Sequence, residues 1–148
     1  KVDGNYSFAF GTNIGVFFQA LSGRPVTRTA NINNIAHIVE NRGNEGRMPM
    51  FTQTDLYLAH DFSIGESKII QVNFNLQNLF NEDETTDTFR EMLRQSINID
   101  IEPRTPYDYL SVINGEAADN PYLRDSRFLM ANAFQAPIEA RLGLRFIF

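Results

Sequence analysis

Four segments of the chain alternate apolar and polar residues with a period of two: Tyr6–Ala20, Thr54–Phe62, Lys68–Leu79 and Ile138–Phe148. Successive side chains of a β-strand point to opposite faces, so each segment predicts a strand with one apolar face. The first segment covers about 14 residues, whereas an ordinary strand has roughly 5–6. This length favours a membrane strand or a strand of a large sandwich.

The third segment has the clearest pair of faces. Its apolar face carries Ile70, Val72, Phe74 and Leu76, and its opposite face carries four amides, Gln71, Asn73, Asn75 and Gln77. A row of amides is unusual in a sandwich core, and it predicts a wet interior whose groups form hydrogen bonds. We expect Glu139, Arg141 and Arg145 of the last segment to line the same interior. The alternative is a half-buried sheet of a soluble protein, with this face solvated.

The lengths of the connections alternate along the chain. About 30 residues (21–50) follow the first segment, a short turn (63–67) follows the second, and about 55 residues (80–136) follow the third. Long extracellular loops that alternate with short periplasmic turns are typical of a bacterial outer-membrane barrel. The expected fold is therefore all-β: the last four strands of an antiparallel transmembrane β-barrel, with two long extracellular loops that carry short helices.

The second long link contains two helix signals. Phe89, Leu93 and Ile97 recur every four residues after the possible caps Thr86 and Asp87, which predicts a first helix.

A second short helix is predicted to begin at Thr105 and Pro106 and to end near Asn114 and Gly115. Residues 80–136 also carry eleven acidic residues against five arginines, a net charge of -6, which leaves +1 for the rest of the chain. An acidic outer loop could recruit cations or a basic ligand, or its charges could serve only to keep it soluble.

Composition narrows the possible partners and cofactors. A net charge of -5 argues against a nucleic-acid partner, and the absence of cysteine excludes disulfides and thiolate metal sites. No apolar run approaches the roughly 20 residues of a transmembrane helix. The chain begins at Lys1 without Met, and Asp3-Gly4 predicts a hairpin turn that needs a preceding strand. We therefore expect a fragment with a cut or processed N-terminus.

Three stretches resemble the C-terminal end of a TonB-dependent outer-membrane receptor, most closely the Oar-like branch. GVFFQALSGRPV (Gly15–Val26) is similar to the strand-to-loop passage of these receptors. TDLYLAHDFSIGESKIIQVNFNLQNLFNED (Thr54–Asp83) resembles the penultimate hairpin, which closes on the word NLFN, and FQAPIEARLGLRFIF (Phe134–Phe148) resembles the last strand. The resemblance implies the last four of about 22 barrel strands, without the plug domain or the TonB box.

The resemblance also implies a function and a location. A TonB-dependent receptor lies in the bacterial outer membrane and takes up a scarce ligand with energy passed through TonB. Its partners would be the lipid bilayer, the rest of the barrel, the plug, TonB indirectly and the assembly machinery. Arg141, Gly143, Phe146 and Phe148 fit the general outer-membrane assembly signal. The alternatives are a soluble β-sandwich that binds a ligand on its amide face and a passive outer-membrane barrel or adhesin.

No enzyme signature is present, and no catalytic residue, cofactor or metal site is predicted. The sequence lacks GxSxG, HExxH, a phosphate-binding glycine loop and a cysteine nucleophile. His60 lies on the predicted lipid-facing side near the periplasmic end, where we expect it to take the place of an interfacial aromatic residue. His37 has no partner at a spacing that would bind zinc. The acidic cluster Glu82–Asp87 lacks the spacing and the glycine of a calcium loop.

Overall fold

The computed structural model describes residues 1–65, 67–100 and 108–148. These residues form antiparallel β-sheets and one α-helix, so the predicted all-β class is confirmed. They divide into two compact units. We call residues 1–22, 50–84 and 135–148 the sheet unit, and residues 23–49 and 85–134 the loop unit. Among the described residues, no helix is both long enough and apolar enough to cross a membrane.

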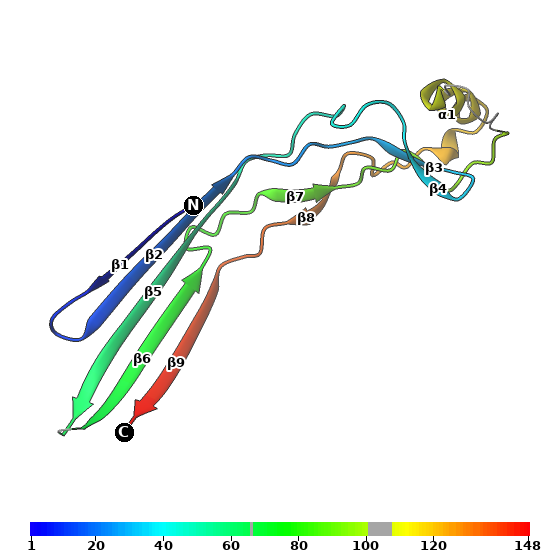
Figure 1. Ribbon diagram of the computed structural model, residues 1–148. Helices are drawn as coiled ribbons and strands as arrows, with labels where there is room; N and C mark the ends of the chain where they lie inside the picture. Colours follow the sequence, from blue (N-terminus) through cyan, green and yellow to red (C-terminus); the bar gives the residue numbers. More distant parts are fainter. Residues whose placement is uncertain (66, 101–107) are drawn as a thin grey trace. The chain divides into compact units, whose positions relative to one another are not determined.

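Five strands make up the sheet unit, and all neighbours are antiparallel (Figure 1). They are β1 (Val2–Ser7), β2 (Thr12–Leu21), β5 (Phe51–Ile64), β6 (Lys68–Gln77) and β9 (Glu139–Ile147), in the spatial order β1-β2-β5-β6-β9. The expected antiparallel order of the four alternating segments is confirmed. Within the described residues the sheet is open, with β1 and β9 at its edges, and it has five strands rather than the expected four.

The extra strand corrects the predicted start of the chain. Asp3 and Gly4 do not form a turn, because both lie inside β1 and pair with Phe17 and Val16 of β2. The turn falls at residues 8–11 instead. There the backbone N–H of Phe8 donates to the carbonyl of Thr12, and Gly11 has a φ of +89°, which a residue with a side chain rarely adopts. The predicted strand Tyr6–Ala20 therefore covers the end of β1, the turn and most of β2.

The sequence NLFN (Asn78–Asn81) forms a network of hydrogen bonds where β6 ends. The Asn78 amide Nδ2 donates to the carbonyls of Glu82 and Ala136 at 2.8 Å each, and its Oδ1 accepts from the Glu82 N–H at 2.9 Å. Asn81 Oδ1 accepts from the backbone N–H of Ile138. Both asparagines adopt a positive φ, which asparagine tolerates better than most residues. This hydrogen-bond network fixes the start of β9 beside the end of β6, although about 60 residues separate them in sequence.

The loop unit has its own strands and its own core. The two long links are not irregular throughout, because they contain β3 (Thr29–Ile32), β4 (Ile35–Ile38), β7 (Thr85–Thr88), β8 (Ala131–Phe134), α1 (Tyr109–Asp119) and the short 3-10 helix η1 (Pro121–Leu123). A two-residue turn of Asn33 and Asn34, both with positive φ, joins β3 to β4, as hairpins prefer. The core contains Ala30, Ile32, Val39, Met92, Leu93, Ile97, Ile113 and Leu123.

Both helix predictions in the second link need correction. Phe89, Leu93 and Ile97 are not helical, since β7 ends at Thr88 and the following segment forms bridges to β3 and to Arg124. Leu93 and Ile97 are buried, so burial in an extended segment explains their apolar character. The predicted helix start at Thr105 and Pro106 lies outside the described residues.

The described helix α1 continues past the predicted stop. Asp108 caps it by accepting the N–H of Ser111, and α1 runs through Asn114 and Gly115 to Asp119. Its buried residues Ile113 and Ala117 lie four positions apart, on either side of the predicted stop, so burial on one face continues the helix beyond Gly115.

Asp125 and Arg127 form an ion pair within the loop unit. Arg127 Nη2 lies 2.8 Å from Asp125 Oδ2, and both Nε and the backbone N–H of Arg127 donate to Asp125 Oδ1 at 3.0 Å. The guanidinium also lies over the ring of Phe89. These hydrogen bonds, with the charge of Arg127, lower the pKa of Asp125 from 3.8 to about 2 and raise the pKa of Arg127.

The lowered pKa of Asp125 predicts a pH-dependent stability of the loop unit. Because the folded-state pKa lies below the unfolded value, the contribution is complete above about pH 4 and is lost as the pH falls through about 2. Asp125→Asn is expected to destabilise the loop unit modestly at neutral pH and to remove this acid-dependent step. Hydrogen exchange of wild type and variant, compared at each pH from 5 to 2, measures it. Parallel curves for the two proteins would contradict the prediction.

Candidate functional site

The register of the sheet places the predicted lumen residues on one face. Asn75 pairs with Tyr57 and Arg141, Asn73 pairs with Ala59 and Gly143, and Gln71 pairs with Asp61 and Arg145 across the neighbouring strands. Gln77 pairs with Glu139. All predicted lumen residues therefore share what we call the polar face, together with Asp3, Asn5, Asn13, Gly15, Phe17 and Asp55 of β1, β2 and β5. Whether this face lines a lumen stays a prediction.

Several side chains of the polar face hydrogen-bond to one another. Gln71 Nε2 donates to Asp61 Oδ1 at 2.7 Å, and Arg141 Nε donates to Glu139 Oε1 at 2.6 Å. Gly143 leaves room for the side chain of Asn73, because a Cβ at Gly143 would lie 2.5 Å from Asn73 Oδ1. Arg141 and Gly143, which are predicted to belong to an assembly signal, thus also have local roles on this face: Arg141 binds Glu139, and Gly143 makes room for Asn73.

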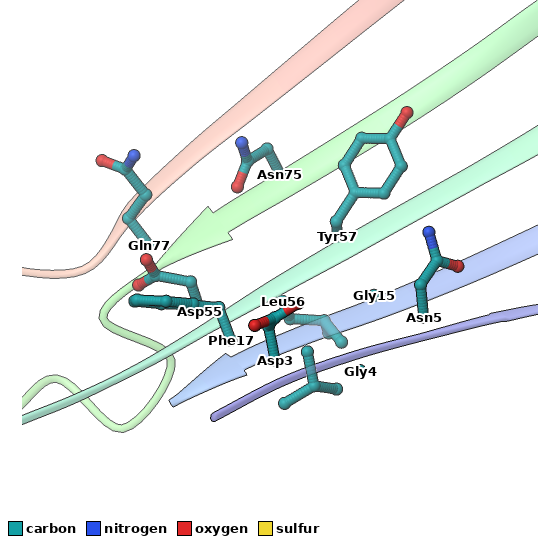
Figure 2. A pocket seen from close by; sticks show the side chains of 11 residues that line it. Asp3, Gly4, Asn5, Gly15, Phe17, Asp55, Leu56, Tyr57, Asn75 and Gln77 are labelled. Atoms are coloured by element: carbon teal, nitrogen blue, oxygen red, sulfur yellow. The ribbon is translucent and has the colours of Figure 1, made fainter. Parts of the chain in front are cut away.

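A hollow of about 350 Å³ opens on the polar face across β1, β2, β5 and β6 (Figure 2). Its side chains are those of Asp3, Asn5, Phe17, Asp55, Tyr57, Asn75 and Gln77, and the backbone of Gly4, Val16 and Leu56 completes it. Gly15 lies between Asn5 and Tyr57 in the register, so it brings no side chain to the floor of the hollow. Four strands must therefore be in register before this site exists.

The polar groups of the hollow are available to a ligand. Within the described part of the chain, the side chains of Asp3, Asn5, Tyr57, Asn75 and Gln77 form no hydrogen bond or ion pair. Asp55 is different, because its Oδ1 accepts from Gln53 Nε2 at 2.8 Å and from the backbone N–H of Asn78 at 2.9 Å. Asp55 is therefore held in place by its neighbours, while the other side chains remain free to bind.

Asp3, Asn5, Phe17 and Tyr57 were missed as site residues by the sequence analysis. Period-two alternation placed Tyr57 and Phe17 on the polar side, but an aromatic residue there carries no signal without its neighbours. Asp3 was assigned to a turn. Strand parity continued through Asp3 and Asn5 would have placed both on the face that carries Gly15 and Phe17, with which they pair in the structure.

The opposite face of the sheet is apolar and uncovered in the described structure. It carries Ile14, Val16, Phe18, Leu56, Leu58, His60, Phe62, Ile70, Val72, Phe74, Leu76, Leu142, Leu144 and Phe146. The side chains of Leu142, Leu144 and Phe146 are 74, 63 and 62 % exposed. Ala59 is the one buried apolar residue among the described residues of the sheet unit. The sheet unit therefore buries little of its apolar surface within the described residues.

Aromatic rings gather on the apolar side near the turns. The Phe8 ring meets that of Tyr6 edge-to-face and lies tilted against that of Phe10, with centroids 4.7 and 5.0 Å apart, and the ring of His60 lies 4.4 Å from that of Phe62. The His60 Nδ1 also lies 2.7 Å from Thr12 Oγ1, in a hydrogen bond. His60 is thus one member of an aromatic cluster, and its position at a membrane interface stays a prediction.

The remaining candidate residues lie apart from the hollow. Phe146 pairs with Ile70 at the far end of β6, and Phe148 follows the last residue of β9 with its side chain 96 % exposed. The role of Arg141, Gly143, Phe146 and Phe148 as an assembly signal stays a prediction. His37 lies on β4 in the loop unit, where its ring centroid is 4.9 Å from that of Tyr109, with the two rings tilted. Among the described residues, no three metal-binding side chains come together.

Comparison of the chain with known protein families, with curated proteins and with solved structures found no match.

Proposed function

We propose that the sheet unit is part of the wall of an outer-membrane β-barrel, and that the protein is a TonB-dependent receptor that takes up a scarce ligand. One observation carries the proposal: five strands in register present an uncovered apolar face on one side and a polar, hydrogen-bonding face on the other. In a barrel wall the apolar face contacts lipid and the polar face lines the lumen. In water, the same apolar face would be costly to leave exposed.

The connections of the strands support the same proposal. The β1–β2 and β5–β6 turns are short, whereas the links from β2 to β5 and from β6 to β9 make up the loop unit. Both long links leave the same end of the sheet, so that end would face the outside of the cell and the short turns the periplasm. The aromatic cluster of Tyr6, Phe8, Phe10, His60 and Phe62 would then lie at the periplasmic interface, where aromatic girdles are found.

The TonB-dependent part of the proposal depends on the resemblance of three stretches to that family. In the structure, the sequence NLFN connects the end of β6 to the segment before β9, since Asn78 Nδ2 donates a hydrogen bond to the carbonyl of Ala136. The plug, the remaining strands and the coupling to TonB belong to the proposal alone.

Fractionation tests the proposal and separates it from the alternatives. We expect the full-length protein that carries this chain to sediment with the outer membrane and to migrate on a gel differently before and after heating, as folded barrels do. Recovery in the soluble fraction without detergent would favour the soluble β-sandwich instead. A membrane-embedded protein whose ligand uptake is unchanged in cells that lack TonB would favour a passive barrel or adhesin.

A further inference from the structure

We infer that the hollow on the polar face binds a neutral saccharide. This inference rests on the proposed function in one respect, since the polar face must be in contact with water for a ligand to reach it. The charge, hydrogen-bonding groups and shape of the hollow each favour such a ligand.

Charge argues against an anionic ligand. Asp3 and Asp55 line the hollow, and among the described residues no Lys or Arg lines it. Arg141 pairs with Asn75 in the register of the sheet, but its Nε is engaged by Glu139 at 2.6 Å. An anion such as a carboxylate or a phosphate would therefore face two negative charges without a matching cation.

Hydrogen-bonding capacity argues against a simple cation. Asn5, Asn75 and Gln77 each carry both a donor and an acceptor, and the Tyr57 hydroxyl does the same. A metal or ammonium ion would use the oxygen acceptors alone and leave the amide N–H groups unpaired. Sugar hydroxyls both donate and accept, so they match this set of groups, and the carboxylates of Asp3 and Asp55 add acceptors for them.

Shape and aromatic content complete the argument. Phe17 and Tyr57 come from neighbouring strands and border the hollow, so they offer apolar surface to the C–H face of a sugar ring (Figure 2). A volume of about 350 Å³ is near the lower end of the range for small-ligand sites, which suits a ligand of one or two rings. Gly15 keeps the floor of the hollow open beneath them.

Binding of neutral disaccharides to the full-length protein tests the inference. The protein is held in a zwitterionic detergent without a sugar head group, and maltose, cellobiose and N,N′-diacetylchitobiose are titrated by calorimetry. We expect at least one of them to bind, and neither spermidine nor glucuronate to compete with it. Absence of heat for all three disaccharides at concentrations up to about 10 mM would overturn the inference, as would competition by spermidine.

Two variants on the two faces of β2 provide a matched control. A Cβ at Gly15 would meet the Tyr57 Cβ at an ordinary 3.5 Å, so the backbone there accepts a side chain, and Gly15→Val adds bulk to the floor of the hollow. Ala20 pairs with Thr52 on the apolar side of the same strand, is exposed and lies outside the hollow, so Ala20→Val adds bulk away from the site. We expect Gly15→Val to weaken saccharide binding at least about tenfold and Ala20→Val to change it less than about twofold. Equal effects of the two variants would contradict the site.

A second pair of variants covers the case in which Gly15→Val fails to assemble. Tyr57→Ala should weaken binding as strongly, whereas Asn73→Ala, on the same face but outside the hollow, should not. Heat-dependent gel migration of each variant shows whether the barrel has formed. A correctly assembled membrane protein that binds no saccharide overturns this inference alone. A soluble protein that binds saccharide through Tyr57 refutes the barrel and keeps the site.

Discussion

Asn78→Asp is expected to lower the free energy of unfolding of the sheet unit by about 2–6 kcal/mol. The side chain of Asn78 is 2 % exposed, and its Nδ2 donates to the carbonyls of Glu82 and Ala136. Aspartate has the same shape and tolerates the same positive φ, but it has no N–H to donate. Both carbonyls lose this donor, and a carboxylate oxygen faces them. Urea unfolding in detergent, followed by heat-dependent gel migration, measures the loss.

Asn81→Asp is the matched control for this prediction. Asn81 has nearly the same backbone angle, with φ of 52° against 51° for Asn78. Its Oδ1 only accepts a hydrogen bond, from the backbone N–H of Ile138 at 3.0 Å, and aspartate retains that bond. We therefore expect a change within about 0.5 kcal/mol. Equal losses of unfolding free energy for the two variants would show that the hydrogen bonds of Asn78 do not hold β9 beside β6.

Val72→Arg is expected to prevent stable insertion of the protein into the outer membrane. Val72 lies in the middle of β6 on the apolar face, between His60 and Leu144. An arginine on the lipid face of a barrel near the bilayer midplane costs about 2–4 kcal/mol. The amount of folded protein in outer-membrane fractions, measured by heat-dependent gel migration, should fall sharply.

Gln71→Arg controls for the size and charge of the new side chain. Gln71 is the next residue along β6 but lies on the polar face, where Asp61 accepts its hydrogen bond at 2.7 Å. An arginine there lies between Asp61 and Arg145, and pairing with Asp61 offsets the repulsion from Arg145, so assembly should proceed nearly as in the wild type. In a soluble sheet, Val72→Arg would be neutral or would improve solubility, and this outcome would contradict a lipid-covered face.

The strands of the sheet unit were predictable because their period of two extends over many residues. The amides of Gln71–Gln77 alternate with Ile70–Leu76 without interruption, and a strand is the one regular structure that places such a series on two faces. Residues 54–62 and 138–148 also alternate clearly, and a short turn at 63–67 joins the first of them to β6. Chain order then gave the antiparallel order of β2, β5, β6 and β9, which the structure confirms.

Local signals failed where distant contacts decide the structure. Asp3-Gly4 favours a turn in isolation, but pairing with Val16 and Phe17 keeps it extended. The spacing of Phe89, Leu93 and Ile97 fits a helix, yet the segment is held by bridges to Thr29 and Ile32 and by burial. The apolar residues of both long links were visible in the sequence, but nothing local shows that the two links share one core.

The hollow on the polar face could not be predicted for a related reason. Its side chains come from four strands, and Asp3 and Gln77 are more than 70 residues apart in sequence. Only the register of β1, β2, β5 and β6 brings Asn5, Tyr57 and Asn75 around Gly15. The amides of β6 were identified from alternation, whereas the aromatic and acidic groups beside them required the strand pairing.

Labelling of single cysteines on the two faces of β6 tests the barrel wall most directly. The chain contains no cysteine, so a thiol placed at Asn73, Asn75, Val72 or Phe74 is the only one that it carries. A charged, membrane-impermeant thiol reagent is applied to the full-length protein in its membrane. We predict that cysteines at Asn73 and Asn75 react from water, while those at Val72 and Phe74 react only after denaturation. Equal reaction on both faces in the intact membrane would contradict a lipid-covered apolar face.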